Sequence, residues 1–341
     1  MTIRTVLISV GMMFLSSSLI AGSRQQHSVN EGSTLAGTIT SVGSDTMKPL
    51  LGNWSDLFRQ LHPGVEFSIE ARGSGTAAAA LAEGRSQIAP MSRPMEATEV
   101  AAFGARYGYA PTGIRVALDA VALYVHPDNP VQGLTLEQLD GIFSAGQRCG
   151  GKRIVRWNEL VKNWRNDQIS IVGRDKLSGT HDFFRSLALC KGDFSNNYEA
   201  MSDSSHVVWK VAQTPNSIGF AGIGYLTQNT KLVPLAKYAG EPYTPIIEES
   251  SQASEMASEQ KRFANVISGK YPLSRFLFIY VNKPPNKRVP PLIEEFLKFV
   301  LSKDGRDAVA KSGFVPLGED QAIEQQTRLK PNYLRPWWGQ D

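Results

Sequence analysis

Three short segments rich in glycine and hydroxyl residues constrain this chain most, because each lies where a strand-like run meets a helix. They are Gly43-Ser44-Asp45-Thr46, Gly73-Ser74-Gly75-Thr76 and the stretch from Arg174 to Thr180. The runs 36–42 and 65–70 have strand patterns and precede the first two segments. This repeated order of strand, polar turn and helix predicts an α/β fold with ligand loops at the carboxyl ends of strands.

The three turns have the chemistry of an anion site. The first turn of a helix carries up to four backbone N–H groups without intrahelical partners, together with a partial positive charge. Glycine allows close approach of the backbone, and Ser and Thr hydroxyls add donors. Arg174 lies four residues ahead of Ser178-Gly179-Thr180, and its planar guanidinium suits bidentate contact with an oxyanion. The simpler interpretations are ordinary helix caps for the turns and a structural salt bridge for Arg174.

Two apolar strand-like runs divide the chain. The run 119–125 and the run 276–281 each leave through a connection that contains two prolines. A domain inserted into another domain requires the chain to pass between the two domains twice, and these two runs with their proline-containing connections fit that requirement. A closing helix is expected over 292–301, ended by Asp304-Gly305. We expect a first lobe made of residues 36–124 and 276–341, and an inserted second lobe of residues 125–275.

Composition favours a globular chain with a large core over a nucleic-acid-binding one. The 341 residues are 42% hydrophobic and 20% charged, which allows extensive burial. The formal net charge is +4 and the pI is near 8.9, but the basic residues are scattered, so no nucleic-acid partner is expected.

The first residues predict export. Arg4 precedes the apolar run 6–15, and small residues end the segment, as in a cleavable secretory signal. The apolar run is shorter than the roughly 20 residues that cross a bilayer, so no stable membrane insertion is expected. A signal anchor is the alternative. We expect residues 1–23 to be a signal peptide and residues 24–35 to be a flexible segment.

The two cysteines and five histidines bear on disulfides, metals and catalysis. In an exported chain the even pair Cys149 and Cys190 predicts a disulfide, and two separate buried thiols are the alternative. The histidines show no metal-ligand spacing, so no metal and no other cofactor is expected. A Gly-x-Ser-x-Gly nucleophile motif is also missing from the sequence, so we expect no enzyme activity.

Six segments, taken in order, resemble the periplasmic phosphate-binding proteins of phosphate ABC transporters. They are GSDTM, ARGSGTA, IAPMSRPM, GRDKLSGTHDFF, SIGFAGIGYL and FVLSKDGRDAVAKSGFVPL, and the resemblance covers about residues 36–320. It implies a two-lobed Venus-flytrap fold of type II topology that holds phosphate between its lobes. It also implies a periplasmic or secreted monomer that delivers phosphate to an inner-membrane permease. The residues that match the family's phosphate loops are Ser44, Asp45, Thr46, Ser74, Gly75, Ser92, Arg93, Arg174, Ser178, Gly179 and Thr180.

One position departs from the family pattern. Well-studied members carry Ser-Asp where this chain has Ser92-Arg93, and the family's Asp accepts the proton of phosphate. Arg93 cannot accept a proton. We expect Asp45 to take that role, with Asp182 as the second candidate, and a plain helix cap is the simpler interpretation of Asp45. An Arg93 that lines the cleft would make the site more cationic and less selective.

Three alternatives to phosphate transport are open at the level of sequence. The ligand could be another oxyanion, such as sulfate, molybdate or a phosphate ester. The chain could be a secreted phosphatase, which would need a metal cluster or an activated nucleophile. It could also be an extracellular sensor or adhesin on the same scaffold.

Overall fold

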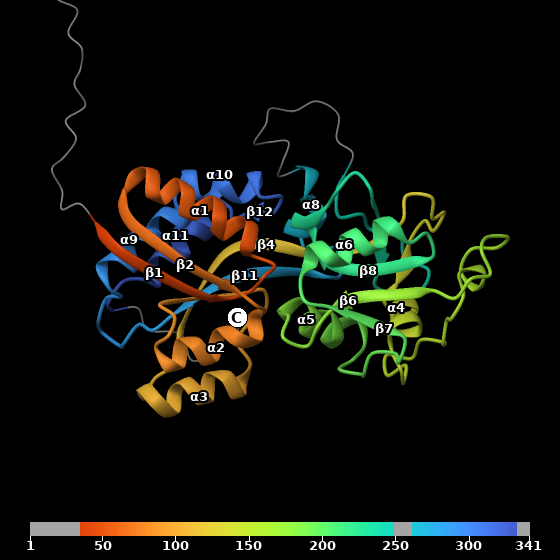
Figure 1. Cartoon of the computed structure of the whole chain (residues 1–341), viewed down its shortest axis with the longest axis horizontal. Helices are drawn as coiled ribbons and strands as arrows, with labels where there is room; N and C mark the ends of the chain where they lie inside the picture. Colours follow the sequence, from red (N-terminus) through yellow and green to blue (C-terminus); the bar gives the residue numbers. More distant parts are fainter. Residues whose placement is uncertain (1–34, 249–260, 333–341) are drawn as a thin grey trace, which may run out of the picture. The chain divides into compact units, whose positions relative to one another are not determined.

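The computed structural model describes residues 35–248 and 261–332. Its main feature is a mixed sheet with the strand order β2-β1-β3-β11-β4-β8-β6-β7, in which β9 and β12 also pair with β4 (Figure 1). The expected signal peptide and almost all of the segment 24–35 lie outside the described residues. Within the described ranges, no helix combines the length and the apolar character needed to cross a membrane.

The strands that matter for the site end in the predicted turns. Strand β1 is a little longer than the predicted run, and β2 runs parallel to it in register from Ala36 opposite Gly64 to Gly43 opposite Ala71. The strands are β1 (Ala36–Gly43), β2 (Gly64–Ala71), β3 (Ile88–Met91), β4 (Thr112–Val125), β5 (Leu134–Thr135), β6 (Ser170–Arg174), β7 (Tyr198–Met201), β8 (Ser217–Gly222), β9 (Lys231–Leu232), β10 (Leu235–Ala236), β11 (Ser274–Val281) and β12 (Val315–Pro316).

Helices connect most of the strands, as expected for an α/β fold. The helices are α1 (Lys48–Leu61), α2 (Ser74–Glu83), α3 (Ala97–Tyr107), α4 (Leu136–Phe143), α5 (Gly179–Ala188), α6 (Ser204–Gln213), α8 (Ala264–Ile267), α9 (Pro291–Leu301), α10 (Lys303–Lys311) and α11 (Glu319–Thr327), with 3-10 turns η1 (Trp157–Glu159) and η2 (Ile223–Tyr225).

Strand β4 is long and connects the two parts of the sheet. Its residues up to Ala120 pair with β11, and its residues from Val121 pair with β8. We call β2, β1, β3, β11 and the first part of β4 the first sheet half. The second part of β4 with β8, β6 and β7 is the second sheet half. The turns after β1 and β2 belong to the first sheet half, whereas the turn after β6 belongs to the second.

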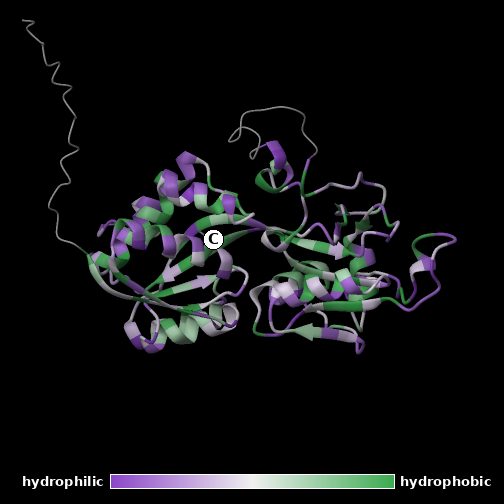
Figure 2. Ribbon diagram, turned by 45° about the horizontal axis from the view of Figure 1, so that its top comes forward, coloured by the Kyte–Doolittle hydropathy of each residue, from purple (hydrophilic) through white to green (hydrophobic). Residues whose placement is uncertain are grey.

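Each sheet half is backed by its own aromatic packing, and hydrophobic residues follow the central strands (Figure 2). In the first half, Phe58 of α1 packs edge-to-face against Phe296 of α9, with ring centroids 5.3 Å apart. In the second half, Phe184 of α5 stacks on Phe220 of β8 at 4.1 Å. Burying large aromatic side chains stabilises each half and fixes where its turns lie.

The closing helix differs from the prediction. Helix α9 ends at Leu301, but α10 begins at Lys303 and runs straight through Asp304-Gly305. The side chain of Ser302 accepts a hydrogen bond from the Gly305 amide and caps α10. Glycine is needed here for space, because a Cβ at Gly305 would lie 2.1 Å from the Phe299 carbonyl oxygen. The prediction that Asp304-Gly305 ends a helix is therefore wrong.

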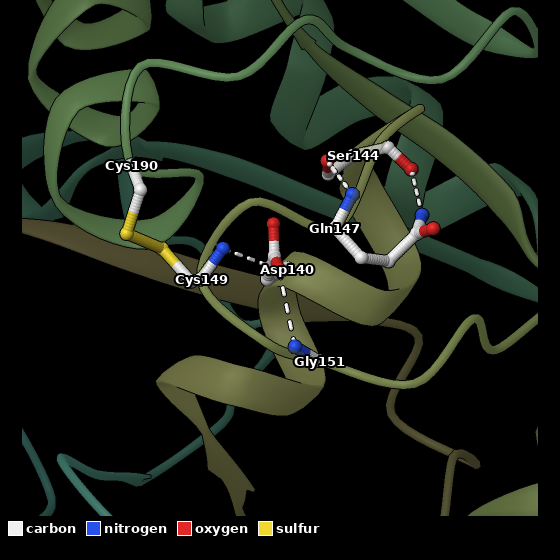
Figure 3. The surroundings of a disulfide bond; sticks show 6 residues. All are labelled: Asp140, Ser144, Gln147, Cys149, Gly151 and Cys190. Carbon is white, nitrogen blue, oxygen red and sulfur yellow. Dashed lines mark hydrogen bonds between the residues drawn. A yellow bond between two sulfur atoms is a disulfide. The ribbon is translucent and has the colours of Figure 1, made fainter.

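A disulfide joins Cys149, in the loop after α4, to Cys190, which follows α5, and confirms the predicted pair (Figure 3). One carboxylate oxygen of Asp140, on α4, accepts hydrogen bonds from the amides of Cys149 and Gly151. This carboxylate orders the loop that carries Cys149. The bridge joins residues that are 41 positions apart in the chain, and such loop closure stabilises a fold mainly by restricting the unfolded chain.

Candidate functional site

Each predicted turn lies between the strand and the helix that the sequence analysis expected. Strand β1 ends at Gly43 and α1 begins at Lys48; β2 ends at Ala71 and α2 begins at Ser74. In the second sheet half, β6 ends at Arg174 and α5 begins at Gly179. Because β1 and β2 are parallel, their turns lie at the same edge of the first sheet half.

The turns of the two sheet halves meet. The hydroxyls of Thr46 and Thr180 are hydrogen-bonded at 2.9 Å, and both side chains are fully buried. Nη1 of Arg174 donates to Oδ2 of Asp45. The Gly75 amide donates to the Leu177 carbonyl at 2.9 Å. The structure therefore brings the three turns to one place.

Two glycines are required by this close approach. Gly73 has φ of 116°, in the region that L side chains avoid, and a Cβ there would lie 2.3 Å from the Leu177 carbonyl oxygen. A Cβ at Gly179 would lie 2.4 Å from Oγ of Ser74 and 2.7 Å from Oγ of Ser92. Any larger residue at Gly179 would force Ser74 and Ser92 away from the start of α5.

Asp45 is not a helix cap. Helix α1 has no side-chain cap, and Oδ2 of Asp45 instead contacts Arg174 and Oγ of Ser204. Its other oxygen, Oδ1, is buried without a hydrogen-bond partner in the part of the chain that the structure describes. The backbone carbonyl of Asp45 accepts the hydroxyl of Tyr225 at 2.7 Å. Asp45 is thus held by both sheet halves with one carboxylate oxygen left over.

Arg174 uses most of its donors on protein groups. Besides Asp45, its guanidinium donates to Oγ of Ser204 and to the carbonyls of Met201 and Ser202. These four hydrogen bonds leave at most one of the five guanidinium N–H groups. The structural salt bridge is therefore present, and a bidentate contact from Arg174 would need some of these bonds to change.

The predicted serines have three different surroundings. Oγ of Ser178 accepts the Thr180 amide at 3.2 Å and caps α5, as the simpler interpretation expected. Oγ of Ser74 contacts Oγ of Ser92 at 3.2 Å and accepts the Ser92 amide at 2.9 Å. Oγ of Ser44 is buried and has no hydrogen-bond partner among the described residues.

Arg93 points to a different set of groups from its neighbour Ser92. Its guanidinium binds both carboxylate oxygens of Glu99, the Pro94 carbonyl and Oδ2 of Asp182. Burial disfavours the charge of Arg93, but Glu99 and Asp182 outweigh burial and raise its pKa. Four of its five N–H groups are occupied, so its charge is already matched by two carboxylates.

Asp182, near the start of α5 in the second sheet half, is the partner of Arg93, which follows β3 in the first sheet half. Its Oδ2 accepts from Arg93 at 3.0 Å, and its Oδ1 lies 3.2 Å from Nδ1 of His181. Burial raises the pKa of Asp182, but His181 and Arg93 outweigh that effect and lower it overall. Both oxygens are engaged, which favours Asp45 over Asp182 as the group with a free acceptor.

The sequence analysis missed a second buried arginine next to the turns. Arg275, at the start of β11, donates to Oδ2 of Asp119 and to Oγ1 of Thr180. Arg275 and Asp119 are register partners on β11 and β4. The sequence contained a signal for this pair, because Asp119 is the first residue of the run 119–125 and Arg275 directly precedes the run 276–281. Opposite charges at such places are typical of paired strands.

No cluster of three or more His, Cys, Asp or Glu side chains suited to a metal ion occurs in residues 35–248 and 261–332. The buried groups at the meeting point are hydroxyls, helix-start amides, two guanidinium groups and a carboxylate oxygen. This set of groups can hold an oxyanion and offers one acceptor for a proton on it.

The fold and this set of groups define a solute-binding protein of the type II periplasmic-binding-protein class. A sequence profile described as the PBP superfamily domain matches residues 28–304. The phosphate-binding protein PstS of Pseudomonas aeruginosa is 44% identical over 290 residues, which cover 84% of this chain and 85% of the relative. The chain belongs to the PstS family of phosphate-binding proteins. Because this is a family of binding proteins, the chain is not an enzyme.

Other relatives extend the comparison. Protein SphX of Synechococcus elongatus is 29% identical over 309 residues, covering 89% of this chain and 85% of the relative. A Clostridium perfringens structure with bound phosphate, assigned as a phosphate ABC transporter substrate-binding protein, matches with a TM-score of 0.66 and 24% identity. It covers 83% of this chain and is itself covered completely. At this identity the structural match confirms the predicted fold class.

Proposed function

We propose that this chain is the substrate-binding protein of a phosphate ABC importer, which binds inorganic phosphate and delivers it to a membrane permease. One observation carries the proposal. Three turns from two sheet halves meet where Ser44 Oγ and Asp45 Oδ1 are buried without hydrogen-bond partners among the described residues. Leaving buried polar groups unpaired costs about 1–3 kcal/mol each, so a ligand that satisfies them is stabilised.

The predicted ligands divide into donors and one acceptor. Hydroxyls and helix-start amides from Ser44, Thr46, Ser74, Ser92 and residues 178–180 would donate to phosphate oxygens, together with the remaining capacity of Arg174 and Arg93. The Gly75 amide would join them only after leaving the Leu177 carbonyl, to which it donates in this structure. Oδ1 of Asp45 would accept the proton of the singly protonated dianion. Sulfate carries no such proton, so its oxygen would face an unpaired carboxylate. This acceptor supports phosphate over sulfate.

We propose that the two lobes move on binding, with lobe I formed by residues 36–124 and 276–341 and lobe II by residues 125–275. The contacts that would form on closure are those between the sheet halves, such as Asp45 with Arg174 and Arg93 with Asp182. In this proposal Arg93 joins the lobes and adds little positive charge to the cleft, because Glu99 and Asp182 match it.

The proposed place of action is the periplasm, after removal of residues 1–23. The chain would act as a monomer, as one ligand site per chain requires no second copy. It would meet its permease at the inner membrane. These proposals rest on the export signal in the sequence and on membership of a family of transport binding proteins.

Calorimetric titration of the chain from Arg24 onward tests the function. We expect one phosphate per chain with a Kd of about 1 µM or tighter, which corresponds to roughly −8 kcal/mol. Arsenate should compete closely because it carries the same proton, and sulfate should bind at least about 100-fold more weakly. Absence of phosphate binding, or sulfate binding of equal strength, would refute phosphate as the ligand.

A further inference from the structure

We propose that Arg275 is a phosphate ligand of this site and that Asp119 is the positioning residue that orients it. This inference deepens the proposed function and rests on it. Arg275 lies outside the residues that the resemblance assigns to phosphate. The argument depends on where its donors go and on what remains unpaired.

The Arg275 side chain is held at a fixed place. It is about 1% exposed, and Asp119 is completely buried. Nε and Nη2 of Arg275 donate to the same oxygen of Asp119 at 2.9 and 2.6 Å. The other oxygen of Asp119 accepts the Ile223 amide at 3.2 Å. The Phe183 ring covers the guanidinium, with 5.5 Å from the guanidinium carbon to the ring centroid.

The guanidinium reaches the meeting point of the turns. Nη2 of Arg275 donates to Oγ1 of Thr180 at 2.8 Å, and the same oxygen contacts Oγ1 of Thr46 at 2.9 Å. Burial lowers the pKa of Arg275, Asp119 opposes that effect, and Asp45 and Arg174 also act on it with opposite signs. The charged groups of the anion site are therefore within electrostatic range of Arg275.

The remaining donors of Arg275 have no hydrogen-bond partner among the described residues. Its Nη1 is buried and has no hydrogen-bond partner within residues 35–248 and 261–332, which leaves two N–H groups unsatisfied. Arg174, by contrast, has at most one N–H group left. Nη1 belongs to the same guanidinium as Nη2, which donates to Thr180, so its two N–H groups are the donors that Arg275 can offer to an oxyanion oxygen.

Asp119 acts through Arg275. It touches no residue of the three turns by a hydrogen bond that the structure records, but its single oxygen fixes both Nε and Nη2. This leaves Nη1 as the one nitrogen of the Arg275 guanidinium without a hydrogen-bond partner among the described groups. A preset donor loses little conformational entropy on binding, which favours affinity.

A charge-balanced double variant tests the ligand role without leaving a buried charge alone. Arg275→Gln with Asp119→Asn removes both charges and keeps groups that can hydrogen-bond to each other. We expect the Kd for inorganic phosphate to rise at least about 30-fold by calorimetry, since the lost contacts are made to a charged ligand. Arg288→Gln, at an exposed arginine paired with Glu294, is the control and should bind like the wild type.

The pH profile separates a ligand from a structural residue. Across the second ionisation of phosphate, the double variant should lose more affinity for the dianion than for the monoanion, so its pH dependence should be flatter than that of the wild type. A residue that only stabilises the fold would lower the unfolding midpoint of the ligand-free chain and leave the shape of this profile unchanged.

The outcomes distinguish this proposal from the proposed function. If the wild type binds phosphate and the double variant binds within threefold of it, Arg275 is not a ligand and phosphate binding stands. If the wild type binds no phosphate, both proposals fail. Should the double variant not fold, a crystal structure of the wild type with phosphate decides: Nη1 of Arg275 within 3.2 Å of a phosphate oxygen, the ordinary limit for such a bond, supports the proposal, and a longer separation overturns it.

Discussion

Two buried arginine–aspartate pairs lie beside the same turns, and they differ in which parts of the fold they join. Arg174 and Asp45 belong to different sheet halves, so their contact exists only while the halves are together. Arg275 and Asp119 are register partners on neighbouring strands, so their contact is part of the sheet itself. In the proposed lobe motion, the pair of Arg174 and Asp45 would form on closure, whereas the pair of Arg275 and Asp119 would already be in place before any ligand binds.

The difference has energetic consequences. A buried ion pair on adjacent strands cannot separate without breaking the sheet, and removing one partner leaves a charge that water cannot reach. A pair that bridges two movable parts can lose a partner at lower cost, because the surviving charge regains water when the parts separate. Similar burial therefore does not mean a similar contribution to stability.

The largest expected effect is on stability, and it comes from breaking the pair of Arg275 and Asp119 on the neighbouring strands β11 and β4. Asp119→Ala should lower the free energy of unfolding of the ligand-free chain by about 3–5 kcal/mol, since Arg275 would stay buried without its counter-charge. Chemical denaturation of the variant and the wild type measures this difference. Asp45→Ala is the matched control, and its loss should be about 1 kcal/mol, in the range of exposed pairs. Equal losses in the two variants would contradict the distinction drawn between the pairs.

The next effect concerns the pair that bridges the sheet halves. Arg174→Ala should weaken phosphate binding at least about tenfold, because closure loses its contact with Asp45 and one donor to the ligand. Calorimetry gives the Kd, and the unfolding midpoint of the ligand-free variant should stay close to that of the wild type. A Kd for phosphate equal to that of the wild type would show that Arg174 is not part of the site. A strongly lowered unfolding midpoint would show that Arg174 contributes to stability as the pair of Arg275 and Asp119 does.

The smallest effect is expected at the contact between the buried Arg93 and the partly exposed Asp182. Arg93→Gln should lower the free energy of unfolding of the phosphate-bound chain by about 1 kcal/mol or less. The pKa of Asp182 is lowered in the folded chain, so its contribution is complete above the ordinary aspartate pKa of 3.8 and is lost as the pH falls below it. The difference between variant and wild type should therefore be constant from pH 5 to 8.

A titration of that difference below pH 5 checks the sign. It should shrink as Asp182 takes up its proton, because the protonated carboxyl no longer attracts Arg93. A difference that stays the same or grows in acid would contradict an attraction between Arg93 and the Asp182 carboxylate.

Most of the fold could be predicted from local sequence. The strand, turn and helix order around Gly43, Gly73 and Arg174 was confirmed because period-2 and period-3.6 patterns record which side chains face the core. The predicted helix end at Asp304-Gly305 was wrong because Gly305 is needed for another reason. A Cβ there would collide with the Phe299 carbonyl of the preceding helix, and such a contact between helices leaves no local sequence pattern.

The chain by itself determined its α/β class, its disulfide partners and the chemistry of its turns, because periodicity, cysteine number and residue type are properties of sequence. Only the tertiary structure decided which groups accept the hydrogen bonds of each arginine side chain. Arg93 binds two acids, Arg174 binds Asp45 and three groups of residues 201–204, and Arg275 has one nitrogen without a hydrogen-bond partner among the described residues. Hydrogen bonds are short and directional, so partners far apart in the chain, such as Arg174 with Asp45 or Arg275 with Asp119, are fixed by packing and register rather than by any pattern along the chain.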